Sequence, residues 1–259
     1  MLQLHRLRPR TETDYGLEDS MKLQIAGLCS LALLVTACGE SPADEAPSTE
    51  PTAPASEAPS LANAAASAEG PFAPKDDCGE LYGFDSFRGQ LRRAITFQNT
   101  DSLAALVDPD VRLDFGGDGG IDALKTRLAD DPSLWSEMSD AIALGCSAEG
   151  ETAVTMPWAF ANLPDGAEAT STYLVTANDA PVRAEAGETA ASNGAISWDL
   201  VKLAGDAPAE GAEYVEVSTL DDATSGFVAA QSLRPITDYR ILANRGDDGW
   251  KVTAFVAGD

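Results

Sequence analysis

Histidine is almost absent from this sequence, and basic residues are scarce. Its 259 residues include one histidine, His5, and 17 Lys and Arg against 42 Asp and Glu, so the formal net charge is −25. This excess of negative charge argues against nucleic acid as a partner, because Lys and Arg must neutralise its phosphates. It also argues against docking on an anionic membrane through basic patches. Hydrophobic residues make up 44% of the chain, which is enough for one or two cores.

The apolar run at residues 23–37 is too short to span a bilayer comfortably. It has 15 residues, whereas a spanning helix takes about 20. With Lys22 before it and small residues at its exit, the run is typical of a signal-peptide core. Acidic residues within 1–20 suit the start of a signal badly, so we expect translation to begin at Met21. The signal peptide is therefore predicted to lie within residues 1–37.

The signal ends in four residues that point to a lipid anchor. Val35, Thr36, Ala37 and Cys38 resemble the lipobox of bacterial lipoproteins. The resemblance implies diacylglyceryl transfer to the Cys38 sulfur, cleavage before Cys38 and N-acylation by a fatty acid such as palmitate. Gly39 is not the aspartate that is linked to inner-membrane retention, which favours the periplasmic face of the outer membrane. The alternative is an ordinary secretory signal that happens to end at a cysteine.

Cleavage before Cys38 would leave a chain without histidine. The removed segment carries four basic and four acidic residues, so the charge of the remainder stays at −25. A Ser-His-Asp triad, a Cys-His pair and histidine-ligated zinc are then excluded. We therefore predict no catalytic residues of these types.

The cysteines suggest one disulfide. Cys29 lies in the signal and Cys38 is the predicted lipid attachment site, which leaves Cys78 and Cys146. In an oxidising compartment we expect these two to pair. Two separate buried thiols are the alternative.

The segment that follows the lipid anchor has the composition of a spacer. Residues 38–77 contain seven prolines and many Ala, Ser and acidic residues, with almost no large apolar side chain. Such a chain buries too little surface to offset the cost of ordering it, so we predict a disordered linker. A partner-binding tail is the alternative.

From Cys78 onward the pattern predicts an α+β domain over residues 78–168. Apolar residues recur at helical spacing from Phe84 to Ile95, with Asp85 or Ser86 as candidate caps. Val111, Leu113 and Phe115 alternate as in a strand. The pattern from Phe87 to Leu128 resembles the start of the nuclear transport factor 2-like cone fold, a family that contains both enzymes and binding domains.

Residues 170–235 carry short strand patterns separated by turns. The stretches that begin at Pro181, Ile196, Tyr214 and Gly226 resemble, in order and spacing, the strands of bacterial SH3-like domains. Pro181 replaces the usual Asn, and the turn at 185–186 also departs from that family. The resemblance implies an all-β barrel; some members of the family bind cell-wall peptides and others are spacers or interaction modules.

The last residues, 236–259, predict a hairpin around the turn at 245–249. Its second strand, from Trp250 to Phe255, resembles the final strand pair of the cone fold. This suggests that the SH3-like barrel is inserted into the first domain. A tandem arrangement of the two domains is the alternative.

Candidate chemistry is sparse. Asp114, Asp118 and Asp122 flank a glycine-rich loop and offer oxygen ligands for calcium. Such loops are usually turns, and we predict no metal.

A cluster of arginines would capture a carboxylate, whereas isolated ones pair with surface acids; the candidates are Arg92, Arg93, Arg112 and Arg183. Tryptophans in apolar segments favour core packing over a sugar-binding platform; these are Trp135, Trp158, Trp198 and Trp250.

These observations predict a periplasm-facing lipoprotein that acts as a binding or scaffolding module, with peptidoglycan or an envelope protein as its partner and no cofactor. One alternative is a carboxylate-based glycan hydrolase or lyase in the cone-like domain. The other is a small-molecule carrier that uses a cavity of that domain.

Overall fold

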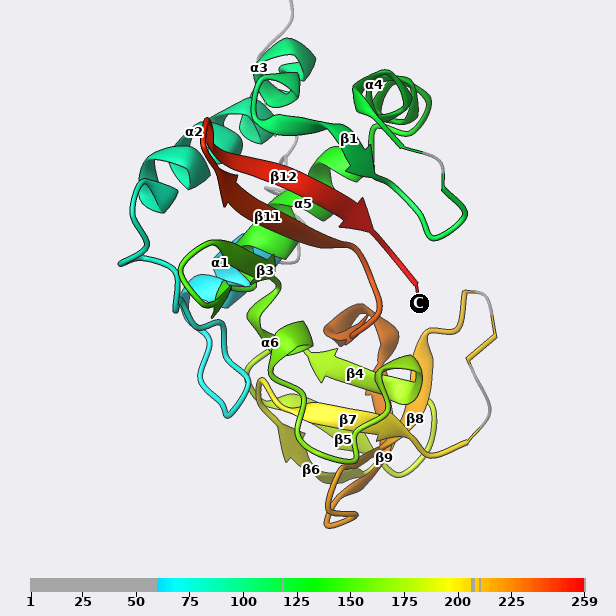
Figure 1. Cartoon of the computed structure of the whole chain (residues 1–259). Helices are drawn as coiled ribbons and strands as arrows, with labels where there is room; N and C mark the ends of the chain where they lie inside the picture. Colours follow the sequence, from blue (N-terminus) through cyan, green and yellow to red (C-terminus); the bar gives the residue numbers. More distant parts are fainter. Residues whose placement is uncertain (1–59, 118, 206–207, 210, 259) are drawn as a thin grey trace, which may run out of the picture. The chain divides into compact units, whose positions relative to one another are not determined.

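The computed structural model describes residues 60–117, 119–205, 208–209 and 211–258 (Figure 1). The described residues all belong to one compact unit of the chain. The predicted signal peptide and the lipid attachment site Cys38 lie outside them. Within the described residues, no helix has the length and apolar character needed to cross a membrane.

The architecture is α+β and contains two sheets. The first is a five-stranded sheet in which β1 runs parallel to β12 and the other pairs are antiparallel. Its spatial order is β1 (Val107–Arg112), β12 (Gly249–Val256), β11 (Arg240–Gly246), β3 (Ala153–Met156) and β2 (Ser147–Glu149). Strands β11 and β12 form the predicted hairpin, and they lie in the middle of this sheet.

The second sheet is formed by residues that lie between β3 and β11 in the sequence. All its strand pairs are antiparallel. Its order is β10 (Leu233–Pro235), β4 (Thr172–Val175), β7 (Leu200–Leu203), β8 (Tyr214–Thr219), β9 (Ser225–Ala229), β5 (Ala180–Arg183) and β6 (Ser192–Ile196). Because β3 and β11 are direct neighbours, the chain leaves the first sheet after β3 and returns to it at β11. The second sheet is thus an insertion, and the tandem alternative is wrong.

The helices follow the apolar periodicity of the sequence. The three longest are α2 (Phe84–Thr96), α4 (Ile121–Asp130) and α5 (Leu134–Ala143), and α5 passes behind strands β11 and β12 in Figure 1. Helix α2 begins after Gly83, whose φ of 76° suits glycine, and no side chain caps it. The predicted cap by Asp85 or Ser86 is therefore wrong, because both residues lie inside the first turn. The short helices are α3 (Thr100–Ala104), α6 (Trp158–Ala161) and the 3₁₀ turns η1 (Ala169–Ser171) and η2 (Ala230–Ser232).

Helices α2 to α5 and the five-stranded sheet share one core. Two of its large side chains come from distant parts of the chain: the ring of Phe84 meets that of Trp250 edge-on, with centroids 5.1 Å apart. A bulge in β12 opposite Leu242 shifts the alternation, so that Val252 and Phe255 both join this core. The space between the sheet and its helices is therefore filled by apolar side chains.

The predicted strand over 196–203 is interrupted. Strand β6 ends at Ile196 and β7 begins at Leu200, and between them Trp198 adopts a φ of 40°. The turn places the Trp198 ring, which is fully buried, in a cluster that joins the two sheets through Leu144, Ala159 and Ile236. Burial of the ring accounts for a break that strand alternation alone does not predict.

The linker prediction is wrong for residues 60–77. Helix α1 (Leu61–Ala66) begins at Ser60, whose hydroxyl oxygen accepts a hydrogen bond from the Asn63 amide. Further along, the Phe72 amide donates to the Trp198 carbonyl at 2.8 Å, and the Phe72 ring lies 6.2 Å from that of Trp158. A few apolar anchors therefore hold a segment whose Ala- and Pro-rich composition resembles a spacer.

Candidate functional site

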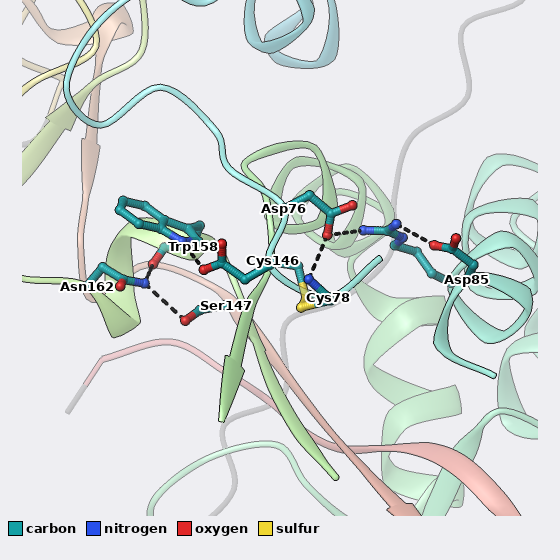
Figure 2. The surroundings of a disulfide bond; sticks show 9 residues. Asp76, Cys78, Asp85, Cys146, Ser147, Trp158 and Asn162 are labelled. Atoms are coloured by element: carbon teal, nitrogen blue, oxygen red, sulfur yellow. Dashed lines mark hydrogen bonds and ion pairs between the residues drawn. A yellow bond between two sulfur atoms is a disulfide. The ribbon is translucent and has the colours of Figure 1, made fainter. Parts of the chain in front are cut away.

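Cys78 and Cys146 form a disulfide with a Cα–Cα distance of 5.9 Å, and Figure 2 shows its surroundings. The carboxylate of Asp76 accepts a hydrogen bond from the Cys78 amide at 3.1 Å and pairs with Arg88 at 2.8 Å. Arg88 also pairs with Asp85 at 2.6 Å. The hydrogen bond from Arg88 lowers the pKa of Asp76, with a smaller contribution from the Cys78 amide.

The disulfide region holds structure together and offers no metal site. Asp76, Cys78 and Cys146 place a carboxylate oxygen and two sulfur atoms within 4.8 Å of one another. The two sulfurs are bonded to each other, so neither is a thiolate that a metal ion would need.

The glycine-rich loop uses Asp114 as an anchor. Its carboxylate pairs with Arg127 at 2.5 Å and accepts hydrogen bonds from the amides of Gly116 and Gly117 at 2.9 and 3.0 Å. Asp122 lies in the first turn of α4, and Asp118 lies outside the described residues. Asp114 thus stabilises the turn, as the glycine-rich composition of the loop predicts.

The four arginines singled out in the sequence do not form one cluster. Arg92 and Arg93 line different hollows on α2, and burial followed by the charge of Arg88 lowers the pKa of Arg92. Arg112 lies on β1. Arg183 lies on β5, in the other sheet, and donates to the Ala190 carbonyl at 3.1 Å.

The tryptophans serve mainly as core residues. Trp135, Trp198 and Trp250 are buried. Trp158 is partly exposed; its indole N–H donates to Asp77 at 2.6 Å (Figure 2), and the Lys75 ammonium lies 4.2 Å from the centroid of its ring system. The Trp158 ring is thus already covered by Lys75, which lies two residues before Asp77. This contact argues against a sugar-binding platform at Trp158.

The feature that best fits a binding site is a groove along the exposed flank of α2. Two adjoining hollows share Gln90, Ala105 and Leu106 in their walls. We call this surface the α2 groove and define it by six residues that line it: Tyr82, Gln90, Arg93, Phe97, Arg245 and Lys251.

Local structure explains how the α2 groove is built. Tyr82 lies just before Gly83, the N-cap of α2, and Phe97 is its C-cap, so the two rings mark the two ends of the helix. The Trp250 indole N–H donates to the Tyr82 carbonyl at 3.0 Å, which fixes the start of the helix against β12. At the other end, Asn99 caps α3 by accepting from the Ser102 amide at 2.8 Å. The walls are thus held by the core and by helix caps.

Positive charge gathers in this groove. The Arg245 guanidinium lies 5.8 Å from the Tyr82 ring centroid, and the Lys251 ammonium donates to the Ala105 carbonyl at 2.5 Å. No carboxylate of the described residues lies within ion-pair distance of Arg93, Arg245 or Lys251. Outside the groove, Lys125 and Lys202 each pair with an aspartate, whereas Arg92, Arg112 and Arg183 form no ion pair with the described residues. Asp248 is the acidic residue that lines the groove.

Apolar rings are exposed at both ends of the groove. Tyr82 is 84% exposed and Phe97 is 76% exposed, and Phe115, elsewhere on the surface, is the third large exposed ring among the described residues. Exposed aromatic rings beside arginines are the composition that protein interfaces favour. The groove can therefore hold a ligand that has both carboxylates and apolar groups.

Sequence reasoning identified Arg93 as a candidate but missed Tyr82, Phe97, Arg245 and Lys251. The signal for the rings was their position just outside the amphipathic pattern of α2. The signal for the cations was their place on either side of the hairpin turn at 246–249. Neither signal shows that the hairpin lies beside α2, because more than 140 positions separate Phe97 from Arg245.

A second group of charged side chains lies where the two sheets meet. Arg234 of β10 pairs with Asp238 at 3.2 Å and with Glu137 of α5 at 3.5 Å, and it donates to the Tyr239 carbonyl at 3.0 Å. Burial, and then the charge of Asp238, raises the pKa of Glu137. Burial also raises the pKa of Asp140. The Arg234 guanidinium thus pairs with two half-buried acids, Glu137 and Asp238. Because Arg234 lies on β10 and Glu137 on α5, these ion pairs link the second sheet to a helix that packs on the first.

No protein family and no curated protein matches this chain.

Proposed function

We propose that this protein is a lipid-anchored binding or scaffolding module of a Gram-negative envelope. In this proposal Cys38 carries the lipid, the folded unit faces the periplasm from the outer membrane, and the partner is peptidoglycan or an envelope protein. The observation that carries the binding role is the α2 groove, which places three cations that have no ion-pair partner among the described residues beside exposed rings on a strongly acidic protein.

The finer fold assignment belongs to the same proposal. We infer that residues 172–235 are a bacterial SH3-like domain and that the remaining unit has the nuclear transport factor 2-like cone fold. Two of the SH3-like sequence stretches support the first assignment, since they fall on β8 and β9, which are paired neighbours. Helices followed by a strand and a further helix, α2 to α4, support the second.

The packing of the first sheet favours a binding surface over the two alternatives. A carrier or a hydrolase in the cone-like unit needs a cavity or cleft between sheet and helices. Large side chains fill that space instead, among them Phe84, Phe87, Trp135 and Trp250.

Photo-crosslinking in intact cells tests the binding role. A benzophenone amino acid at Phe97, inside the α2 groove, is compared with the same group at Phe115, an exposed ring outside it. We expect a covalent adduct from Phe97 and none from Phe115, and digestion of the cell wall with a muramidase shows whether the adduct is peptidoglycan. Equal labelling at both positions, or none at either, would remove the role assigned to this groove.

The anchor has its own test. Radiolabelled palmitate should enter the protein and should be lost in the Cys38→Ser variant, and membrane fractionation should recover the unsubstituted protein with the outer membrane. An unlabelled protein in the cytosol would contradict both the anchor and the compartment.

A further inference from the structure

We infer that the α2 groove binds an extended, acidic polypeptide segment of about seven residues with apolar side chains near both ends. This inference rests on the proposed function and names the chemistry of the partner: a segment of an envelope protein. It is carried by the length of the groove, its charge and the placement of its exposed rings.

The length follows from helix geometry. Helix α2 has 13 residues, and a rise of 1.5 Å per residue makes it about 20 Å long. Tyr82 and Phe97 stand just beyond its two ends. An extended polypeptide advances about 3.3 Å per residue, so about six steps, from the first to the seventh residue of a segment, span this length, and the first and seventh side chains then point to the same face.

The charge selects carboxylates. Arg93 and Arg245 each offer a planar fork of N–H donors that suits a carboxylate, and the Lys251 ammonium has donors beyond the one given to Ala105. Against these three cations the groove lining includes one acid, Asp248. Two carboxylates would balance the excess charge.

The rings select apolar side chains. Tyr82 and Phe97 expose most of their surface, and covering such rings with another apolar group is favourable. Arg245 already lies over Tyr82, so a partner's carboxylate at Arg245 and its apolar side chain at Tyr82 would be neighbours. This pairing of ring and cation favours a peptide over a bare glycan, which has no apolar side chains.

The overall charge argues against ligands of high charge density. A protein of net charge −25 repels nucleic acids and anionic lipid surfaces at long range. A short segment with two carboxylates experiences much weaker repulsion and gains the local contacts of the groove.

Peptide binding to the full-length protein, purified in nonionic detergent, tests the inference. The probe is a fluorescent seven-residue peptide with blocked ends, Phe at both ends and two Glu between them; its partner has Gln in place of Glu. We expect the Glu peptide to bind about tenfold more tightly than the Gln peptide, and the difference to shrink at 0.5 M salt. Equal affinities would overturn the inference.

Matched variants locate the binding. Arg93→Gln and Arg245→Gln should each weaken the Glu peptide about three- to tenfold and leave the Gln peptide nearly unchanged. Arg112→Gln and Lys125→Gln remove the same charge outside the groove and should have no comparable effect. Equal weakening by the outside variants would show a general charge effect and contradict the assigned site. Melting curves show that each variant is folded.

A muropeptide competitor separates this inference from the proposed function. If the disaccharide-tetrapeptide of the cell wall displaces the Glu peptide more strongly than unlabelled Glu peptide does, the partner is peptidoglycan and the inference is wrong while the binding role stands. If Phe97 gives no adduct in cells, the proposed function fails even where the peptide binds in solution.

Discussion

The two sheets of this protein are held together by different kinds of core. The five-stranded sheet shares its core with four helices, and that core contains large rings such as Phe84, Trp135 and Trp250. The seven-stranded sheet has a core of small aliphatic residues, mostly valines, of which Val182, Val201, Val217 and Val228 are fully buried.

The sheets also differ in where their strands come from. Strands β4 to β10 lie within residues 172–235, whereas β1 and β12 are neighbours that lie more than 130 positions apart. Closing a long loop costs entropy before the contacts are made. The first sheet therefore depends on distant parts of the chain and on the Cys78–Cys146 bond, and the second depends on nearby strands. The predictions that follow test this difference, from the largest effect to the smallest.

Removal of residues 240–259 should have the largest effect. It deletes β11 and β12 from the middle of the five-stranded sheet and exposes its core. Hydrogen exchange should show loss of protection over residues 84–156 and retained protection over β7, β8 and β9. Loss of protection in both sheets would show that the second sheet does not fold without the first.

Removal of the disulfide should destabilise the first sheet selectively. The bond links positions separated by 68 residues, which corresponds to about 4 kcal/mol in the chain-entropy account. In Cys78→Ala/Cys146→Ala, thermal unfolding of the first sheet should shift to lower temperature, while that of the second stays close to its original position. A uniform shift of the whole protein would contradict the separation drawn between the sheets.

A single valine should matter less. Val217 of β8 is fully buried, and Val217→Ala removes two methyl groups from the small core. We expect a loss of about 1 to 2.5 kcal/mol, measured by urea unfolding with a probe in the second sheet. As a control, Thr253→Ala on the partly buried face of β12 should cost less.

The smallest effect concerns the acids between the sheets. The raised pKa of Glu137 means that its protonation favours the folded state: this contribution is fully present below the ordinary carboxyl range and is lost as the pH rises through the raised pKa. At neutral pH the Glu137→Gln variant should therefore be as stable as the parent or more stable, with a difference in unfolding free energy under about 1 kcal/mol. On mild acidification the parent should gain stability as Glu137 becomes protonated, and the variant should gain less.

Asp76 supplies the opposite control. Its pKa is lowered, so its contribution is present above the ordinary carboxyl range and is lost as the pH falls through the lowered value. Asp76→Asn should destabilise the protein at neutral pH, and melting temperatures between pH 3 and pH 8 would show the two opposite trends. Parallel profiles for the two variants would contradict the roles given to these acids.

Local patterns predicted much of the secondary structure. Spacing of 3.6 residues located α2, and the two remaining cysteines indicated the disulfide bond. The pattern failed where a tertiary contact outweighed it. Trp198 turns the chain to bury its ring, and Leu61 and Phe72 order a segment whose composition alone predicts a spacer.

Local sequence accounts for helix α2 and the terminal hairpin, because periodicity is a property that each segment carries whatever surrounds it. It did not indicate α1, and it placed a strand over Val111, Leu113 and Phe115 where the structure has β1 at Val107–Arg112. It also determined the acidic charge and the cysteines available for pairing. Only the tertiary structure decided that the second sheet is inserted and that Arg245 and Lys251 lie beside α2. The physical reason is that strand pairing and core burial bring distant segments together, and a binding groove is made from the side chains that such packing leaves exposed.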